Sequence, residues 1–120
     1  MLSIIDGLPA NVVGMRAEGK VHAQDYRSVL DPAIEAALAA HDRIRMLYVL
    51  GPGFDGYSGG AMWQDTKLGM AHWSAWERIA VVTDHSAYAD GVRAVGWMIP
   101  AEVRVFPVAE LDAATAWVSE

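Results

Sequence analysis

The stretch from Ile44 to Trp76, IRMLYVLGPGFDGYSGGAMWQDTKLGMAHWSAW, decides the fold. Its beginning, Arg45 to Leu50, is a nearly continuous apolar run, which is typical of a strand covered on both faces of a parallel sheet. Five glycines follow within ten residues, and they predict a mobile loop from Gly51 to Gly60. The next segment, Met62 to Trp73, predicts a helix because its apolar side chains recur at helical spacing.

Two short catalytic motifs are matched inside the predicted loop. Gly51 to Gly56 matches G-x-G-x-x-G, but a dinucleotide fold needs that turn to open directly into a helix. Gly56 to Gly60 matches G-x-S-x-G, but a nucleophile elbow needs its serine on a tight strand-to-helix turn, and the predicted strand ends near Leu50. The later pair Asp84 and His85 are neighbours in sequence, so their side chains should point apart. We therefore predict no catalytic residues and no enzymatic activity.

Strand and helix patterns alternate on both sides of this stretch. We expect further strands at Val12–Glu18, Arg78–Thr83 and Glu102–Phe106, the last an edge strand, and helices beginning near His22, at Ser86–Gly96 and at Leu111–Val118. Alternation at this spacing implies βαβ crossovers. The sequence thus predicts one α/β domain over residues 1–120, with a small, mostly parallel sheet.

The helix that begins near His22 contains a proline. Asp25 falls in its first turn, where a carboxylate is favourable. Pro32 lacks the N–H that a helix interior needs. Either the helix kinks there, or Asp31 caps a new start with Pro32 at the first position.

Composition narrows the classes of function. The chain has 120 residues, 53% of them apolar, no cysteine and a net charge of −6. An acidic surface disfavours nucleic acid and electrostatic docking on anionic lipid, while apolar insertion at a membrane stays open. The four histidines lack the spacing of a helical zinc site, so no metal and no cofactor are expected. The N-terminus does not resemble a signal peptide, and no apolar run approaches roughly 18 residues, so we expect a cytoplasmic protein with peripheral membrane association at most.

The predicted helix carries methionine and tryptophan on one face. That face holds Met62, Trp63, Thr66, Gly69, Met70 and Trp73. Such a stripe is more often core than ligand cavity. Its position beside a glycine-rich loop also suits an apolar pocket or an interfacial face. Asp65 and His72 lie on one flank of this predicted helix. They form either a pH-sensitive polar patch or a solvated helix face.

Several segments, taken in order, resemble the SpoIIAA-like proteins of the STAS superfamily. The similarity is carried by Phe54–Tyr57, Ala61–Lys67, His72, Glu77–Val82, Glu102–Phe106 and Ala116–Val118, with Asp25 and Tyr26 in the first helix. The resemblance implies a small sheet with helices wound in a βα superhelix. For the SpoIIAA-like branch it implies binding of a lipophilic ligand or of a membrane through mobile helices. For anti-sigma-factor antagonists it implies phosphorylation of a serine just after the central strand, where Ser58 stands in a Gly-Tyr-Ser-Gly context.

The leading hypothesis is a non-enzymatic module that binds a lipophilic small molecule or lipid. Its predicted lining residues are Phe54, Tyr57, Met62, Trp63, Met70, Trp73 and Trp76. The expected partners are a lipophilic ligand or a membrane surface, with a homodimer as a further candidate. The alternative is a regulatory protein-interaction domain of the anti-sigma-factor-antagonist type, with Ser58 as the modification site.

Overall fold

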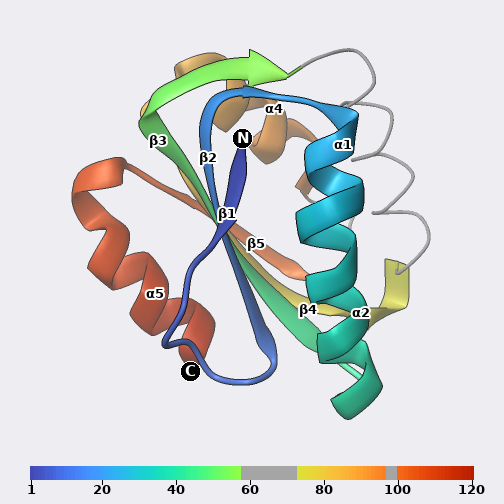
Figure 1. Cartoon of the computed structure of the whole chain (residues 1–120). Coiled ribbons are helices and arrows are strands. Elements are labelled where there is room, and N and C mark those ends of the chain that lie inside the picture. Colours follow the sequence, from blue (N-terminus) through green and yellow to red (C-terminus); the bar gives the residue numbers. More distant parts are fainter. Residues whose placement is uncertain (58–72, 97–99) are drawn as a thin grey trace.

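The computed structural model describes residues 1–57, 73–96 and 100–120. Five strands form one sheet in the order β1-β2-β3-β4-β5 (Figure 1). They are β1 (Leu2–Ile4), β2 (Val12–Val21), β3 (Ile44–Tyr57), β4 (Trp76–Val82) and β5 (Glu102–Phe106). β1 is antiparallel to β2, and the other neighbouring pairs are parallel. The predicted α/β fold with a small, mostly parallel sheet is confirmed.

The central strand β3 is longer than its apolar run. It continues through the glycine-rich stretch to Tyr57, so the predicted loop from Gly51 is wrong as far as Tyr57, and residues 58–60 lie outside the described residues. β2 also continues to Val21 and gives the glycine-rich stretch a partner, because Gly19 pairs with Phe54 and Val21 with Tyr57. Backbone pairing with β2 thus outweighs the conformational freedom of glycine.

The helices cover both faces of the sheet. They are α1 (Ala23–Asp25), α2 (Asp31–Ala40), α4 (Ser86–Gly96) and α5 (Leu111–Ser119), with a π-helical turn η1 (Tyr26–Leu30) and 3-10 turns η2 (Trp73–Ala75) and η3 (Val108–Glu110). α4 has the predicted bounds, and α5 ends one residue later than predicted. At the start of α1, Asp25 Oδ2 accepts a hydrogen bond from the His22 N–H at 2.8 Å.

The proline in the first helical segment lies at the start of α2. The Asp31 N–H donates to the Tyr26 carbonyl oxygen, five residues back, in the π-helical turn η1. Leu30 and Asp31 both have right-handed helical dihedral angles, so the helical backbone continues into Pro32. The predicted fresh start capped by Asp31 is therefore wrong: Asp31 is the first residue of α2 and Pro32 the second, and the irregularity before Pro32 is the π-helical turn.

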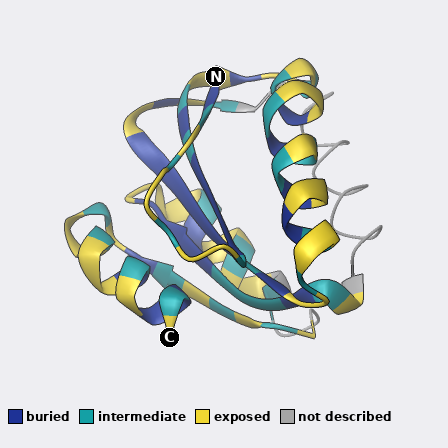
Figure 2. Ribbon diagram, turned by 60° about the horizontal axis from the view of Figure 1, so that its bottom comes forward, coloured by how far each residue is buried: buried dark blue, intermediate teal, exposed yellow. Residues whose placement is uncertain are grey.

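Two apolar layers lie on opposite faces of the sheet. On the α2 face, Tyr26, Leu30 and Ile34 pack against strand residues such as Met15 and Tyr48. On the α5 face, the layer contains Leu47, Val49, Ala80, Val82, Phe106, Ala114, Trp117 and Val118. Figure 2 shows the buried residues along the strands and on the helix sides turned toward the sheet.

An irregularity at the start of β4 places Trp76 on the α2 face. Ile44 pairs with Trp76, but the next residue, Arg45, pairs with Arg78, so Glu77 is an extra residue in β4. Side chains alternate between the two faces of a strand, so without the extra Glu77 the Trp76 side chain would lie on the same face as Arg78 and Ala80. Trp76 instead lies in the core of the α2 face with 4% of its surface exposed.

Candidate functional site

Three rings form a cluster at the edge of the sheet where the parallel strands end. Phe54, near the end of β3, contacts His85 and Tyr88 edge-on, with ring centroids 5.6 and 5.3 Å apart. His85 and Tyr88 also meet edge-on at 6.0 Å. Phe54 is 5% exposed, whereas His85, just before α4, is exposed. The cluster therefore joins the end of β3 to the start of α4.

The turn between β4 and α4 directs its two titratable side chains to different elements. Asp84 Oδ1 accepts a hydrogen bond from the Val108 N–H at 3.0 Å, while the His85 ring lies against Phe54. The His85 N–H donates to Thr83 Oγ1 at 3.0 Å and fixes the turn. Asp84 and His85 thus do not pair as the acid and base of a catalytic triad.

The extended β3 bears on whether Ser58 could be a catalytic nucleophile. Because β3 ends at Tyr57, Ser58 follows a strand directly, so the separation from Leu50 no longer speaks against a nucleophile elbow. The different directions of the Asp84 and His85 side chains speak against a catalytic triad instead. Ser58 itself lies outside the described residues, as do Asp65 and His72.

The predicted lining residues fall into three groups. Phe54 and Trp76 are both buried on the α2 face, but Trp76 pairs with Ile44 at the start of β3, whereas Phe54 lies near its end. The structure therefore does not bring these two side chains together. Tyr57 and Trp73 are described by their backbone alone, and Met62, Trp63 and Met70 lie outside the described residues. The lining set stays a prediction.

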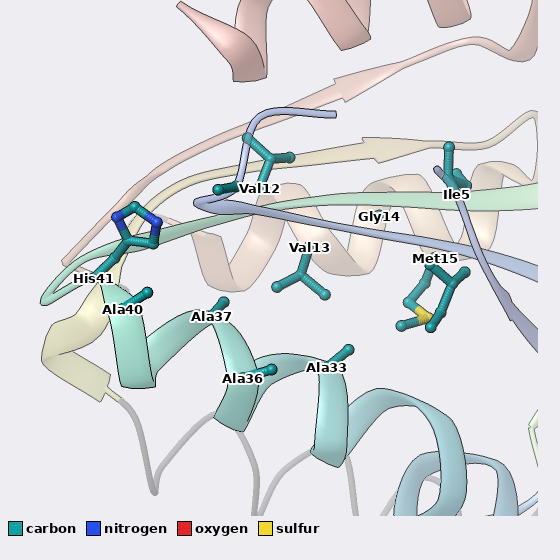
Figure 3. A pocket seen from close by; sticks show the side chains of 12 residues that line it. Ile5, Val12, Val13, Gly14, Met15, Ala33, Ala36, Ala37, Ala40 and His41 are labelled. Carbon is teal, nitrogen blue, oxygen red and sulfur yellow. The ribbon is translucent and has the colours of Figure 1, made fainter. Parts of the chain in front are cut away.

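An open apolar groove lies between α2 and the β1–β2 edge of the sheet, with a volume of about 280 Å³. Its helical wall is a row of alanines, Ala33, Ala36, Ala37 and Ala40, and its other wall is formed by β1, β2 and the segment between them, with Ile4, Ile5, Ala10, Val12, Val13, Gly14 and Met15 (Figure 3). His41, just after α2, closes one end. The volume lies just below the usual range of small-molecule sites, roughly 300–1,000 Å³.

This groove was not predicted from the sequence. The sequence does contain a sign of it. The four alanines recur at helical spacing, and their short side chains leave a shallow depression along one side of the helix. Ala33 and Ala37 also fit the buried face of an ordinary amphipathic helix. The strand β1, which completes the other wall, has three residues and no alternating pattern, so it was not predicted.

In the described residues, no group of three histidine, aspartate or glutamate side chains could hold a metal ion. Of the helices in these parts of the chain, none is long and apolar enough to span a bilayer.

Comparison with known proteins gives the family. A family model described as SpoIIAA-like matches residues 12–119. The chain therefore belongs to the SpoIIAA-like family. The crystal structure of an uncharacterized protein with a SpoIIAA-like fold from Shewanella loihica PV-4 matches with a TM-score of 0.80 and 26% identity, over 98% of this chain and 93% of that chain. No functionally curated protein matches the chain.

Proposed function

We propose that this protein is a non-enzymatic module that binds a lipophilic molecule on the α2 face of its sheet. The observation that carries the proposal is the open apolar groove between α2 and the β1–β2 edge. Proteins of the SpoIIAA-like family are generally non-enzymatic, which agrees with this role. Phe54 and Trp76 belong to the same apolar layer as Val13 and Met15 of the groove wall, so these two predicted lining residues share a face of the sheet with that wall.

The size of the groove limits the affinity that it supplies alone. Each buried methylene contributes about 0.8 kcal/mol, so a segment of roughly five carbons contributes about 4 kcal/mol before ordering costs. Even without those costs, that free energy corresponds to a dissociation constant of only about 1 mM, so the groove alone binds more weakly than this. A micromolar ligand would need further apolar surface, which the predicted residues Met62, Trp63 and Met70 would supply.

A thermal-shift experiment with dodecanoate tests the proposal. Ala36 lines the groove and is exposed, so Ala36→Phe should fill the groove from its rim without disturbing the core. Ala39 is exposed on the same helix but does not line the groove, and Ala39→Phe is the matched control. We expect dodecanoate to raise the Tm of the wild type and of Ala39→Phe by several degrees, by mass action.

The response of Ala36→Phe decides the location of the site. The proposal predicts that its dodecanoate-dependent shift is less than about half that of the control. Equal shifts in all three proteins would place the ligand elsewhere, and no shift in any of them would contradict lipophilic binding. Trp63→Ala tests the predicted second surface, because it should weaken binding while leaving the groove intact.

Peripheral membrane association is part of the same proposal. A groove that is open at the surface can accept an acyl chain from a bilayer without a spanning helix. Flotation with neutral phosphatidylcholine vesicles is the suitable assay, because the net charge of −6 disfavours anionic lipid. The wild type and Ala39→Phe should float with the vesicles, and Ala36→Phe should float less.

The extended β3 favours a second candidate function. In anti-sigma-factor antagonists, the family resemblance implies a phosphorylated serine just after the central strand, and Ser58 directly follows the end of β3 at Tyr57. We therefore also propose Ser58 as a modification site in a regulatory protein-interaction domain. Intact-mass analysis of protein from its native cells should show a species heavier by one phosphate, absent in Ser58→Ala. Unmodified protein under every growth condition would contradict this candidate.

A further inference from the structure

We propose that the β1 edge of the sheet is a surface for self-association, where a second copy of this chain adds its own β1 in antiparallel pairing. The inference goes beyond lipid binding, because it rests on the backbone and side chains of an edge strand, although the second copy would use the same groove as the lipid. Its partner is a second copy, and the resulting complex is a two-fold symmetric dimer.

The backbone of β1 presents an unpaired row of polar groups. Met1 and Glu18 exchange hydrogen bonds, with the Met1 ammonium and Glu18 O 2.7 Å apart and the Glu18 N–H and Met1 O 2.9 Å apart. The Ile5 N–H bonds to Gly14 O at 2.9 Å. Because bonded residues alternate in an antiparallel pair, the backbone groups of Leu2 and Ile4 point away from β2. Among the described residues no strand lies beyond β1, so this row can pair with another chain.

Two large apolar side chains at this edge are exposed. In the described parts of the chain, Met1 and Ile4 are the large hydrophobic residues that are exposed, with 62% and 56% of their surfaces accessible. Ile4 is the last residue of β1, and Met1 directly precedes this strand. The opposite edge strand, β5, exposes Glu102 and Arg104 instead. Charged side chains protect an edge from pairing, so β5 is protected and β1 is not.

The occupant of the β1 edge follows from self-complementarity. A two-fold interface needs a projecting group and a matching hollow on the same patch. Ile4 is an exposed apolar side chain on the edge strand, and the groove along the alanines of α2 begins beside it, with Ile4 on its wall. Side chains of a second β1 could therefore enter the groove while the two backbones pair.

Charge also favours a second copy at this edge. The chain has a net charge of −6, which opposes self-association over most of its surface. The segment from Met1 to Ile5 has no charged side chain, and His41 is the titratable residue among those that line the groove. Two copies that meet at β1 therefore avoid direct contact between like-charged side chains.

Sedimentation velocity over a range of protein concentrations tests the dimer, on protein shown by native mass spectrometry to be free of lipid. Ile4→Lys places a charge at the centre of the interface. Ile4→Pro removes the outward N–H while leaving the bonds of Met1 and Ile5 to β2 in place. Glu102→Gln is the control, because it changes the net charge by the same amount as Ile4→Lys, at the opposite edge.

The proposal predicts that the wild type and Glu102→Gln form dimers with similar dissociation constants. Ile4→Lys and Ile4→Pro should each raise that constant by about tenfold or more. Because Ile4 is largely exposed, Ile4→Lys should fold even if the proline variant does not. A wild type that stays monomeric at every concentration, or dimers that survive Ile4→Lys, would overturn the proposal.

Discussion

Arg78 of β4 binds the last turn of α5 through Trp117 in two ways. Its guanidinium donates a hydrogen bond to the Trp117 carbonyl oxygen at 2.8 Å, and its central carbon lies 5.2 Å from the centroid of the Trp117 ring. Arg104 of β5 lies at 5.2 Å from the same ring, and Arg45 of β3 donates to the Val118 carbonyl oxygen at 3.0 Å. Three neighbouring strands thus place arginines at the C-terminal end of α5, where positive charge is favourable.

Replacing Arg78 should destabilise the fold more than replacing an exposed arginine. The Arg78 side chain is 23% exposed, so Arg78→Ala removes a partly buried, charge-assisted hydrogen bond, and we expect a loss of about 1.5–3 kcal/mol in the free energy of unfolding. Arg78→Lys keeps the charge but not the planar donor, so its loss in the free energy of unfolding should be smaller than that of Arg78→Ala but not zero. Arg93→Ala is the control, because Arg93 is 62% exposed, and should change stability by less than about 0.5 kcal/mol. Urea unfolding measures all three, and equal losses at Arg78 and Arg93 would contradict this assignment.

Two glycines should respond to alanine in opposite directions. A Cβ at Gly91, inside α4, would meet open space, so Gly91→Ala should stabilise the protein by about 0.5–1 kcal/mol through helix propensity. A Cβ at Gly14 in β2 would lie 3.0 Å from Ile5 Cβ and 3.2 Å from the Ile5 carbonyl oxygen. Gly14→Ala should therefore cost about 1–3 kcal/mol. Thermal melts of both variants test the pair, and a Gly14→Ala variant as stable as the wild type would mean that Ile5, just after β1, does not pack against Gly14 as described.

The ring cluster at the end of β3 should be energetically coupled. Phe54 and Tyr88 meet edge-on at 5.3 Å, and such pairs contribute roughly 0.5–1.5 kcal/mol beyond the area they bury. A double-mutant cycle with Phe54→Leu and Tyr88→Leu should give a coupling energy in that range. Additive effects of the two substitutions would show that the end of β3 and the start of α4 are energetically independent.

The sequence predicted the regular elements where one physical signal was dominant. α4 has the predicted bounds, and β5 does as well, because a periodic apolar pattern ends at clear turn residues in both. The end of β3 was not predictable from local preference, since five glycines argue for a loop. Pairing with the extended β2 decides its conformation, and that partner is distant in sequence.

The candidate site was less predictable for a related reason. The alanines of α2 have the same spacing whether they pack tightly or line a groove, and the difference depends on what lies opposite. That surface includes Ile4 of β1, a strand too short to give a pattern. Trp76 likewise lies on the α2 face because of one extra residue, Glu77, whose effect appears only in the register with β3.

Methyl NMR with dodecanoate tests the central claim, that the α2 face binds a lipophilic molecule, most directly. With labelled alanine, isoleucine and valine methyl groups, the account predicts concentration-dependent shifts at Ala36, Ala40 and Val13 in the groove. The methyl groups of Ala114 and Val118, buried on the α5 face, should not shift. Shifts of equal size on both faces, or no shift at the groove up to the solubility limit of dodecanoate, would contradict the account.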